Sequence, residues 1–178
     1  ATGEFIEKTI ITPFGKDVVL GDCVGDDAVY AGKGCEISMR QEEGGVRIYV
    51  DVADFGGKVL KAEFQISEPE NHESLNVVVP WSERLFQFPA KNNTLPTQGS
   101  LFLDGKQIIF EAGTSFATPD FGRGVWPYKG FWNWASFSTR LADGRTVGTN
   151  FGAGWTDNSG ATENALCVDG RLTKLSED

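Results

Sequence analysis

Histidine, cysteine and methionine are scarce in this chain of 178 residues. The single histidine, His72, excludes a metal site built on two histidines, and a serine–histidine–acid triad would have to use this one residue. The three cysteines, Cys23, Cys35 and Cys167, include no C-x-x-C pair, so neither a disulfide framework nor a zinc knuckle is indicated. We interpret them as buried free thiols, with a bond between Cys23 and Cys35 on neighbouring strands as the alternative.

Positive charge is also in short supply, because 16 lysines and arginines face 25 aspartates and glutamates, a formal net charge of −9. Because so little basic surface remains, we expect that the chain does not bind nucleic acid and that an anionic membrane repels it. No apolar run approaches the roughly 20 residues of a membrane span, and the start ATGEFIEKTI lacks the apolar core of a secretory signal. We therefore expect a soluble, cytoplasmic protein without a metal or other cofactor.

Glycine and aromatic residues are abundant, with 22 glycines, 13 phenylalanines and 5 tryptophans, which favours turn-rich β structure. Apolar and polar residues alternate in the stretches 46–52 and 59–66, the period of a strand with one buried face. Gly56–Gly57 lies between these stretches and predicts a hairpin. Three Asp-Gly pairs predict further hairpins with tight type I′ turns: Asp104–Gly105, Asp143–Gly144 and Asp169–Gly170.

The fold class that follows is all-β, because no stretch has the period of an amphipathic helix and about ten to twelve short strands are predicted. We expect an antiparallel meander that forms a barrel or a barrel-like sandwich, in a single domain over residues 1–178. The strands predicted outside the hairpins named above are Phe5–Ile11, Ala28–Gly32, Glu36–Arg40, Leu75–Val79 and Phe131–Phe137.

One segment, 117–137, is dense in aromatic residues and holds three of the five tryptophans. The signatures of nucleophile elbows, phosphate-binding loops and zinc proteases are absent from the sequence. Alternation in FWNWASF places Trp132 and Trp134 on one face of a strand and Asn133 on the other. Indole rings offer a broad apolar surface and one N–H donor, so they suit the binding of apolar or ring-shaped ligands.

Two carboxylates are candidates for chemistry, Asp120 within this segment and Glu163 further along the chain. Asp120 and Arg123 lie three residues apart at a glycine-rich bend and predict an ion pair that either fixes the corner or orients a ligand. Glu163 is either a turn carboxylate that accepts backbone N–H groups or, together with Asn150, an acid inside an aromatic cavity. A carboxyl group in an apolar pocket can stay protonated near neutral pH and act as a general acid.

Four segments resemble a bacterial and fungal family catalogued as a domain of unknown function: KNNTLPTQGSLFLDG, PDFGRGVWPYKGFWNWASF, DGRTVGTNFGAG and TENALCVDGRLTKL. That family is similar, more distantly, to two-barrel lipocalin-like proteins that include carotenoid hydratases and fungal cyclases. The resemblance implies a lipocalin-like barrel with a cavity for an apolar ligand. It also implies a second β-rich half beyond Asp178, unless the chain is a one-barrel relative. The residues that match by position are Asp120, Arg123, Trp126, Tyr128, Trp132, Asn133, Trp134, Asn150, Glu163 and Asn164.

Three hypotheses for function follow from these observations. In the first, the matched residues other than the two carboxylates bind a hydrophobic small molecule, such as a lipid, an isoprenoid or a polyketide. The second is a hydratase- or cyclase-type enzyme with Asp120 or Glu163 as general acid. The third is a carbohydrate-binding or glycoside-cleaving β-sandwich, in which tryptophans stack on sugar rings. A closed cavity with one inward acid favours the first two hypotheses, and an open groove with coplanar exposed rings favours the third.

Overall fold

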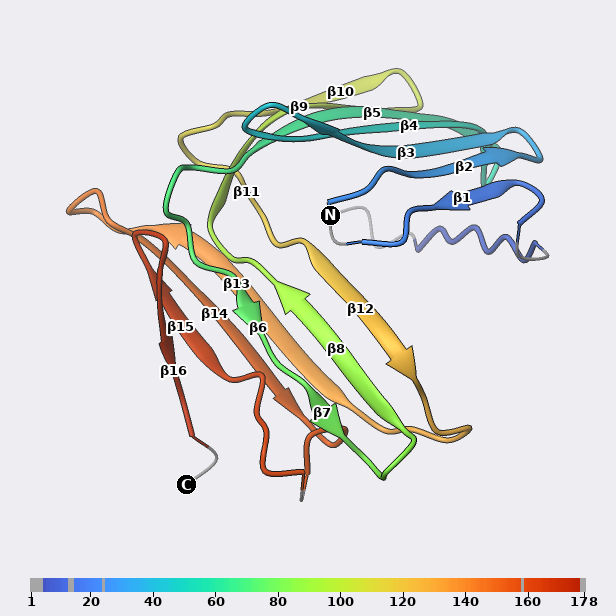
Figure 1. Cartoon of the computed structure of the whole chain (residues 1–178). Helices are drawn as coiled ribbons and strands as arrows, with labels where there is room; N and C mark the ends of the chain where they lie inside the picture. Colours follow the sequence, from blue (N-terminus) through green and yellow to red (C-terminus); the bar gives the residue numbers. More distant parts are fainter. Residues whose placement is uncertain (1–4, 13–14, 24, 158, 177–178) are drawn as a thin grey trace. The chain divides into compact units, whose positions relative to one another are not determined.

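The computed structural model describes residues 5–12, 15–23, 25–157 and 159–176, and it is built from β-strands (Figure 1). These residues form 16 strands, every strand pair is antiparallel, and none of the described residues is helical. The all-β prediction is confirmed. The number of strands exceeds the prediction because several strands have only two to four residues. None of the described segments is a helix long and apolar enough to cross a membrane.

Two compact units share the chain, and each consists of two separate segments. Unit 1 contains Ala1–Ser67 and Thr97–Ala112, and unit 2 contains Glu68–Pro96 and Gly113–Asp178. The strands of unit 1 pair in the order β1-β2-β3-β4-β5-β9-β10. Their bounds are β1 (Val18–Leu20), β2 (Ala28–Gly32), β3 (Cys35–Glu42), β4 (Gly45–Phe55), β5 (Lys58–Ser67), β9 (Leu95–Leu103, within unit 1 from Thr97) and β10 (Lys106–Phe110).

Two of the predicted hairpins close this sheet. Gly56 and Gly57 both have positive φ angles, 63° and 82°, and join β4 to β5. Asp104 and Gly105 have φ angles of 51° and 79° and join β9 to β10, as a type I′ turn requires. The strand predicted at Phe5–Ile11 is wrong, because this segment pairs with no strand. Its residues instead line an apolar groove together with side chains of the sheet.

Unit 2 contains two further sheets, and their strands are drawn in green to red in Figure 1. In the first sheet, β8 (Phe86–Lys91) is central and pairs with β12 (Asp120–Val125), β6 (Leu75–Asn76) and β7 (Val79–Pro80). The strand predicted at Leu75–Val79 is therefore divided in two. The second sheet has the order β13 (Asn133–Arg140), β14 (Thr146–Ala153), β15 (Ala165–Val168) and β16 (Arg171–Lys174). The short strand β11 (Phe116–Ala117) pairs with Leu95 and Pro96 at the start of β9.

The two remaining hairpin predictions differ in outcome. Asp169 and Gly170, with φ angles of 48° and 77°, join β15 to β16 in the predicted tight turn. At Asp143–Gly144 the hairpin is correct but the turn type is wrong, since only Gly144 has a positive φ angle. The loop is longer, and the Asp143 carboxylate accepts a hydrogen bond from the backbone N–H of Arg145 at 3.1 Å. A side chain therefore stabilises a turn that the Asp-Gly pair alone does not form.

The sheets of unit 2 contact each other through polar side chains. Asn93 Nδ2, beyond the end of β8, donates to Ser136 Oγ on β13 at 2.8 Å and to the carbonyl oxygen of Thr149 on β14 at 3.0 Å. Asn93 is 2% exposed, so these bonds satisfy a buried amide. Strand pairing in the described residues closes no barrel, and the predicted lipocalin-like barrel is not confirmed.

Candidate functional site

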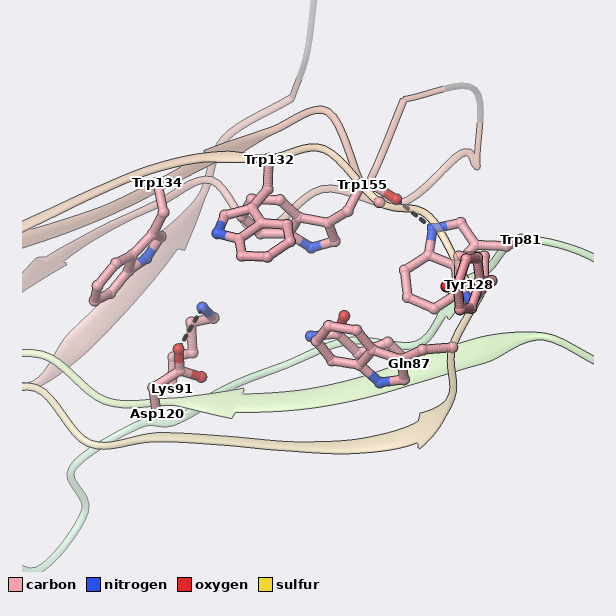
Figure 2. Close-up of a pocket in the computed structure, with 11 residues that line it drawn as sticks. Trp81, Gln87, Lys91, Asp120, Tyr128, Trp132, Trp134 and Trp155 are labelled. Atoms are coloured by element: carbon pink, nitrogen blue, oxygen red, sulfur yellow. Dashed lines mark hydrogen bonds and ion pairs between the residues drawn. The ribbon is translucent and has the colours of Figure 1, made fainter. Parts of the chain in front are cut away.

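An aromatic pocket of about 370 Å³ lies in unit 2, and all five tryptophans of the chain line it (Figure 2). Figure 2 shows Trp132, Trp134 and Trp155 on one side of the pocket, with Gln87, Lys91 and Asp120 on the other. The residues that line this aromatic pocket are Trp81, Gln87, Lys91, Asp120, Trp126, Pro127, Tyr128, Gly130, Trp132, Trp134 and Trp155. Tryptophans distant in sequence are thus gathered around one space.

Strand periodicity explains how the side chains reach the pocket. Trp132, directly before β13, and Trp134, its second residue, point to the same side, as predicted from the alternation in FWNWASF. On β8, Gln87 and Lys91 lie four residues apart and therefore share a face. A buried polar face on a strand opposite two indoles gives the pocket an apolar side and a polar side.

The polar side is dominated by Lys91, which lies between two carboxylates. Lys91 is directly opposite Asp120 in the pairing of β8 with β12, and Lys91 Nζ is 3.0 Å from Asp120 Oδ2. The same nitrogen is 3.1 Å from Oε2 of Glu163, in the segment before β15. The side chain of Lys91 is 5% exposed and that of Glu163 is fully buried, whereas the Asp120 side chain is 41% exposed. Asp120 is therefore the accessible member of this ion cluster.

Glu163 connects the ion cluster to the aromatic side of the pocket. Its Oε1 accepts a hydrogen bond from the indole N–H of Trp155 at 2.8 Å, while Oε2 faces Lys91. Asn150, which is also fully buried, donates to the carbonyl oxygen of Glu163 at 2.7 Å and accepts from the indole N–H of Trp134 at 2.8 Å. The Glu163 carboxylate therefore points inward, toward Lys91 and an indole, instead of accepting backbone N–H groups of a turn, but neither Glu163 nor Asn150 lines the pocket as an acid inside the cavity would.

Further contacts fix the orientation of the rings. Lys91 Nζ lies 4.9 Å from the ring centroid of Trp134 and 5.7 Å from that of Trp155, within the range of cation–π attraction. Trp81 donates its indole N–H to the carbonyl oxygen of Trp155 at 2.5 Å. Trp81 also packs edge to face on Trp126, with centroids 5.9 Å apart and ring planes at 70°. The rings are therefore held in place by the protein itself.

The structure brings together seven of the ten residues singled out in the sequence. Two of them, Asn150 and Glu163, lie directly behind the rings rather than at the pocket surface. The five that line the pocket are Asp120, Trp126, Tyr128, Trp132 and Trp134.

The other three residues lie outside the pocket lining. Arg123 is three residues from Asp120 on strand β12, so the two side chains leave opposite faces, and its guanidinium lies 5.7 Å from the ring centroid of Phe121. Asp120 pairs with Lys91 instead of the predicted partner Arg123. Asn164 accepts a hydrogen bond from the backbone N–H of Gly152 at 2.8 Å, and Asn133 is exposed.

Sequence reasoning missed Lys91, Gln87, Trp81 and Trp155. For Lys91 the alternation in FQFPAK is misleading, because it places the lysine with Gln87 and Pro89 on the face opposite the apolar residues, which predicts exposure to solvent. The structure buries this polar face, so the lysine requires a partner of opposite charge that the sequence does not indicate. For Trp81 and Trp155 the sequence contains no pattern that places them at the pocket.

Comparison with known proteins places the chain at the level of a family. The family model described as "Domain of unknown function (DUF2804)" matches residues 1–177. No curated protein and no solved structure gives a significant match. The resemblance to a domain of unknown function is thereby confirmed and extends over both units, whereas the more distant likeness to lipocalin-like enzymes is not confirmed by this match.

Proposed function

The chain belongs to the DUF2804 family, and for this member we propose that the aromatic pocket binds a small molecule with a hydrophobic body, of lipid, isoprenoid or polyketide type. The observation that carries the proposal is the gathering of all five tryptophans around one pocket. Three of them keep about half of their surface exposed: Trp126 53%, Trp132 60% and Trp134 46%. These large apolar side chains are gathered around one pocket, and a contiguous exposed apolar cluster of this kind is typical of an interaction site.

The energetics favour a ligand with an apolar body. Covering apolar surface contributes about 25 cal/mol per Å², so a ligand that covers several indole faces gains substantial free energy. The volume of about 370 Å³ falls within the range of small-molecule pockets. Because hydrogen bonds hold Trp134, Trp155 and Trp81 in place, little side-chain entropy is lost when the ligand binds. From the resemblance to lipocalin-like proteins the proposal takes one feature, a site for an apolar ligand in a β-rich domain.

A second candidate function is hydratase- or cyclase-type catalysis, and one observation favours it. Asp120 is the carboxylate that lines the pocket among apolar rings, so it could exchange a proton with a bound ligand. Glu163 is fully buried, and both of its oxygens face protein groups. We therefore assign to Glu163 the positioning of Lys91 and Trp155, and to Asp120 any proton transfer.

The carbohydrate hypothesis is not part of the proposal. Trp81 and Trp126 meet at 70°, so this pair does not form a coplanar platform of the kind on which sugars stack. The accessible group of the ion cluster is also a single carboxylate, that of Asp120, rather than a row of groups for several hydroxyls.

A fluorescence titration tests the proposed function, because all five tryptophans line the pocket. The probe is 4-phenyl-1-butanol, a neutral molecule with an apolar ring. We expect a saturable change in tryptophan emission, and binding weakened about tenfold in Trp132→Ala. Phe131→Ala is the matched control, since Phe131 is 70% exposed and adjacent to Trp132 but does not line the pocket. An emission that does not saturate, or an equal loss in both variants, contradicts the proposal.

A further inference from the structure

The charge of the ligand's polar end is set by the ion cluster, and this inference rests on the proposed function. Lys91, Asp120 and Glu163 meet at one place, with Lys91 Nζ 3.0 Å and 3.1 Å from the two carboxylates. One ammonium thus faces two carboxylates, so the cluster has one negative charge in excess. Lys91 cannot attract an anionic ligand strongly, because its charge is already more than compensated.

The solvent accessibility of the two side chains strengthens the preference against anionic ligands. The Lys91 side chain is 5% exposed, whereas that of Asp120 is 41% exposed, so a ligand meets the carboxylate of Asp120 before the ammonium of Lys91. In Figure 2 the dashed line from Lys91 reaches one of the two Asp120 oxygens. The other oxygen is an acceptor for a hydrogen-bond donor of the ligand.

The aromatic side of the pocket has the same electrostatic preference. The face of an indole ring carries the negative part of its quadrupole and attracts cations. Lys91 uses this attraction over Trp134 and Trp155. Trp126 and Trp132, which are about half exposed, present further ring surface to a ligand.

We propose that the aromatic pocket selects ligands whose hydrophobic body ends in a positively charged hydrogen-bond donor, an ammonium group, and that it excludes carboxylates such as fatty acids. The ammonium donates to the accessible oxygen of Asp120, a charge-assisted bond that is stronger than a neutral one. A hydroxyl can make the same bond without the charge, so alcohols rank between amines and carboxylates. A carboxylate meets the negative Asp120 and the negative ring faces together.

The test compares three probes with the same body: 4-phenylbutylamine, 4-phenyl-1-butanol and 4-phenylbutanoate. Near neutral pH they are positive, neutral and negative. We expect the Kd of the amine to be at least about tenfold lower than that of the carboxylate, with the alcohol between them, and the difference to shrink as salt is added. A carboxylate that binds as tightly as the amine overturns the inference but leaves the proposed function standing. Binding of none of the three overturns the proposed function as well.

A pair of variants separates the pocket from the overall charge of the chain. Asp120→Asn removes one negative charge with little change of shape and leaves Lys91 with Glu163, so the ratio of the two Kd values should approach about one. Glu70→Gln removes one negative charge from an exposed loop residue outside the aromatic pocket and should leave the ratio unchanged. An equal effect of both variants would mean that the preference arises from the net charge of −9, and it would refute the proposed role of Asp120.

Discussion

Oε2 of Glu163 lies 3.1 Å from Nζ of Lys91, and water reaches almost nothing of either side chain. The pair depends on mutual compensation, because the opposite charge of the partner is the main offset to the desolvation of each charge, with smaller contributions from Asp120 and the neighbouring indoles. Removal of one partner therefore affects stability more than the removal of both.

Lys91→Met should lower the free energy of unfolding by about 3–5 kcal/mol, because it leaves Glu163 buried without a compensating charge. Urea unfolding followed by tryptophan fluorescence measures this change in unit 2, since all five tryptophans belong to that unit. The double variant Lys91→Met/Glu163→Gln should recover much of the loss. Arg145→Met breaks an exposed ion pair with Asp143 and should have a far smaller effect. A double variant as unstable as Lys91→Met would show that the uncompensated charge is not the cause.

Gly152→Ala should displace the Trp155 ring, which lines the aromatic pocket. A Cβ at Gly152 would lie 2.5 Å from an atom of the Trp155 indole, so the ring has to move away from its hydrogen bond with Glu163. We expect a shifted emission spectrum and weaker binding of 4-phenyl-1-butanol. Gly113→Ala is the control, because a Cβ there meets no atom within 4 Å and φ is not positive. A wild-type spectrum and wild-type affinity in Gly152→Ala would contradict the packing described.

Glu73 should make the stability of unit 2 depend on pH. The backbone N–H of Leu172, at 2.6 Å, and the guanidinium of Arg171, at 2.8 Å, hold the pKa of Glu73 below its ordinary value. The unfolded chain therefore binds this proton more readily. The stabilisation is present above the ordinary pKa of a glutamate, about 4.3, and is lost as the pH falls through the lower pKa of the folded state.

Unfolding curves of wild type and Glu73→Gln between neutral and acidic pH check this dependence. The variant should be less stable at neutral pH, and the difference should vanish in acid. Glu70→Gln, three residues earlier in the same loop, should show no such convergence. A constant difference between wild type and Glu73→Gln at all pH values would assign the effect to packing instead of to the charge.

The three cysteines should differ in reactivity. Burial raises the pKa of the Cys35 thiol, and Cys167 is fully buried, whereas Cys23 is exposed. Iodoacetamide should modify Cys23 alone in the native protein and all three thiols in urea. The expectation that all three are buried is therefore wrong for Cys23. Mass spectrometry counts the modified thiols, and fewer than three in urea would reveal a disulfide bond that the structure does not contain.

Sequence patterns predicted the features that depend on a few neighbouring residues, such as turns and the face of a strand on which a side chain lies. Gly56–Gly57 and Asp104–Gly105 determine their turns through φ angles that other residues adopt at a cost, so the hairpins could be identified directly. The side on which Trp132 and Trp134 lie follows from the period of a strand in the same way. Asp143–Gly144 has the same dipeptide but a different turn, because the side chain of Asp143 bonds to the backbone of Arg145.

The ion cluster could not be predicted, because it depends on pairing between distant segments. Lys91 meets Asp120 through the register of β8 with β12, and Glu163 comes from a third segment before β15. The sequence places Asp120 next to Arg123 but contains no information on strand order, so the nearer cation was expected as its partner. The same reason explains why Trp81 and Trp155 were missed.

The interleaving of the two units along the chain has a consequence for biosynthesis. When a ribosome has released the segments up to Ala112, every strand of the unit 1 sheet is available, and that sheet can form. By then Lys91 has already left the ribosome, but Asp120 and Glu163 have not yet emerged from it. The Lys91 side chain is therefore hydrated until β12 pairs with β8. The pocket is completed only after Glu163 has been synthesised. Until that point Lys91 and the tryptophans that precede Glu163 lack part of their surroundings, so the incomplete pocket is exposed on the nascent chain.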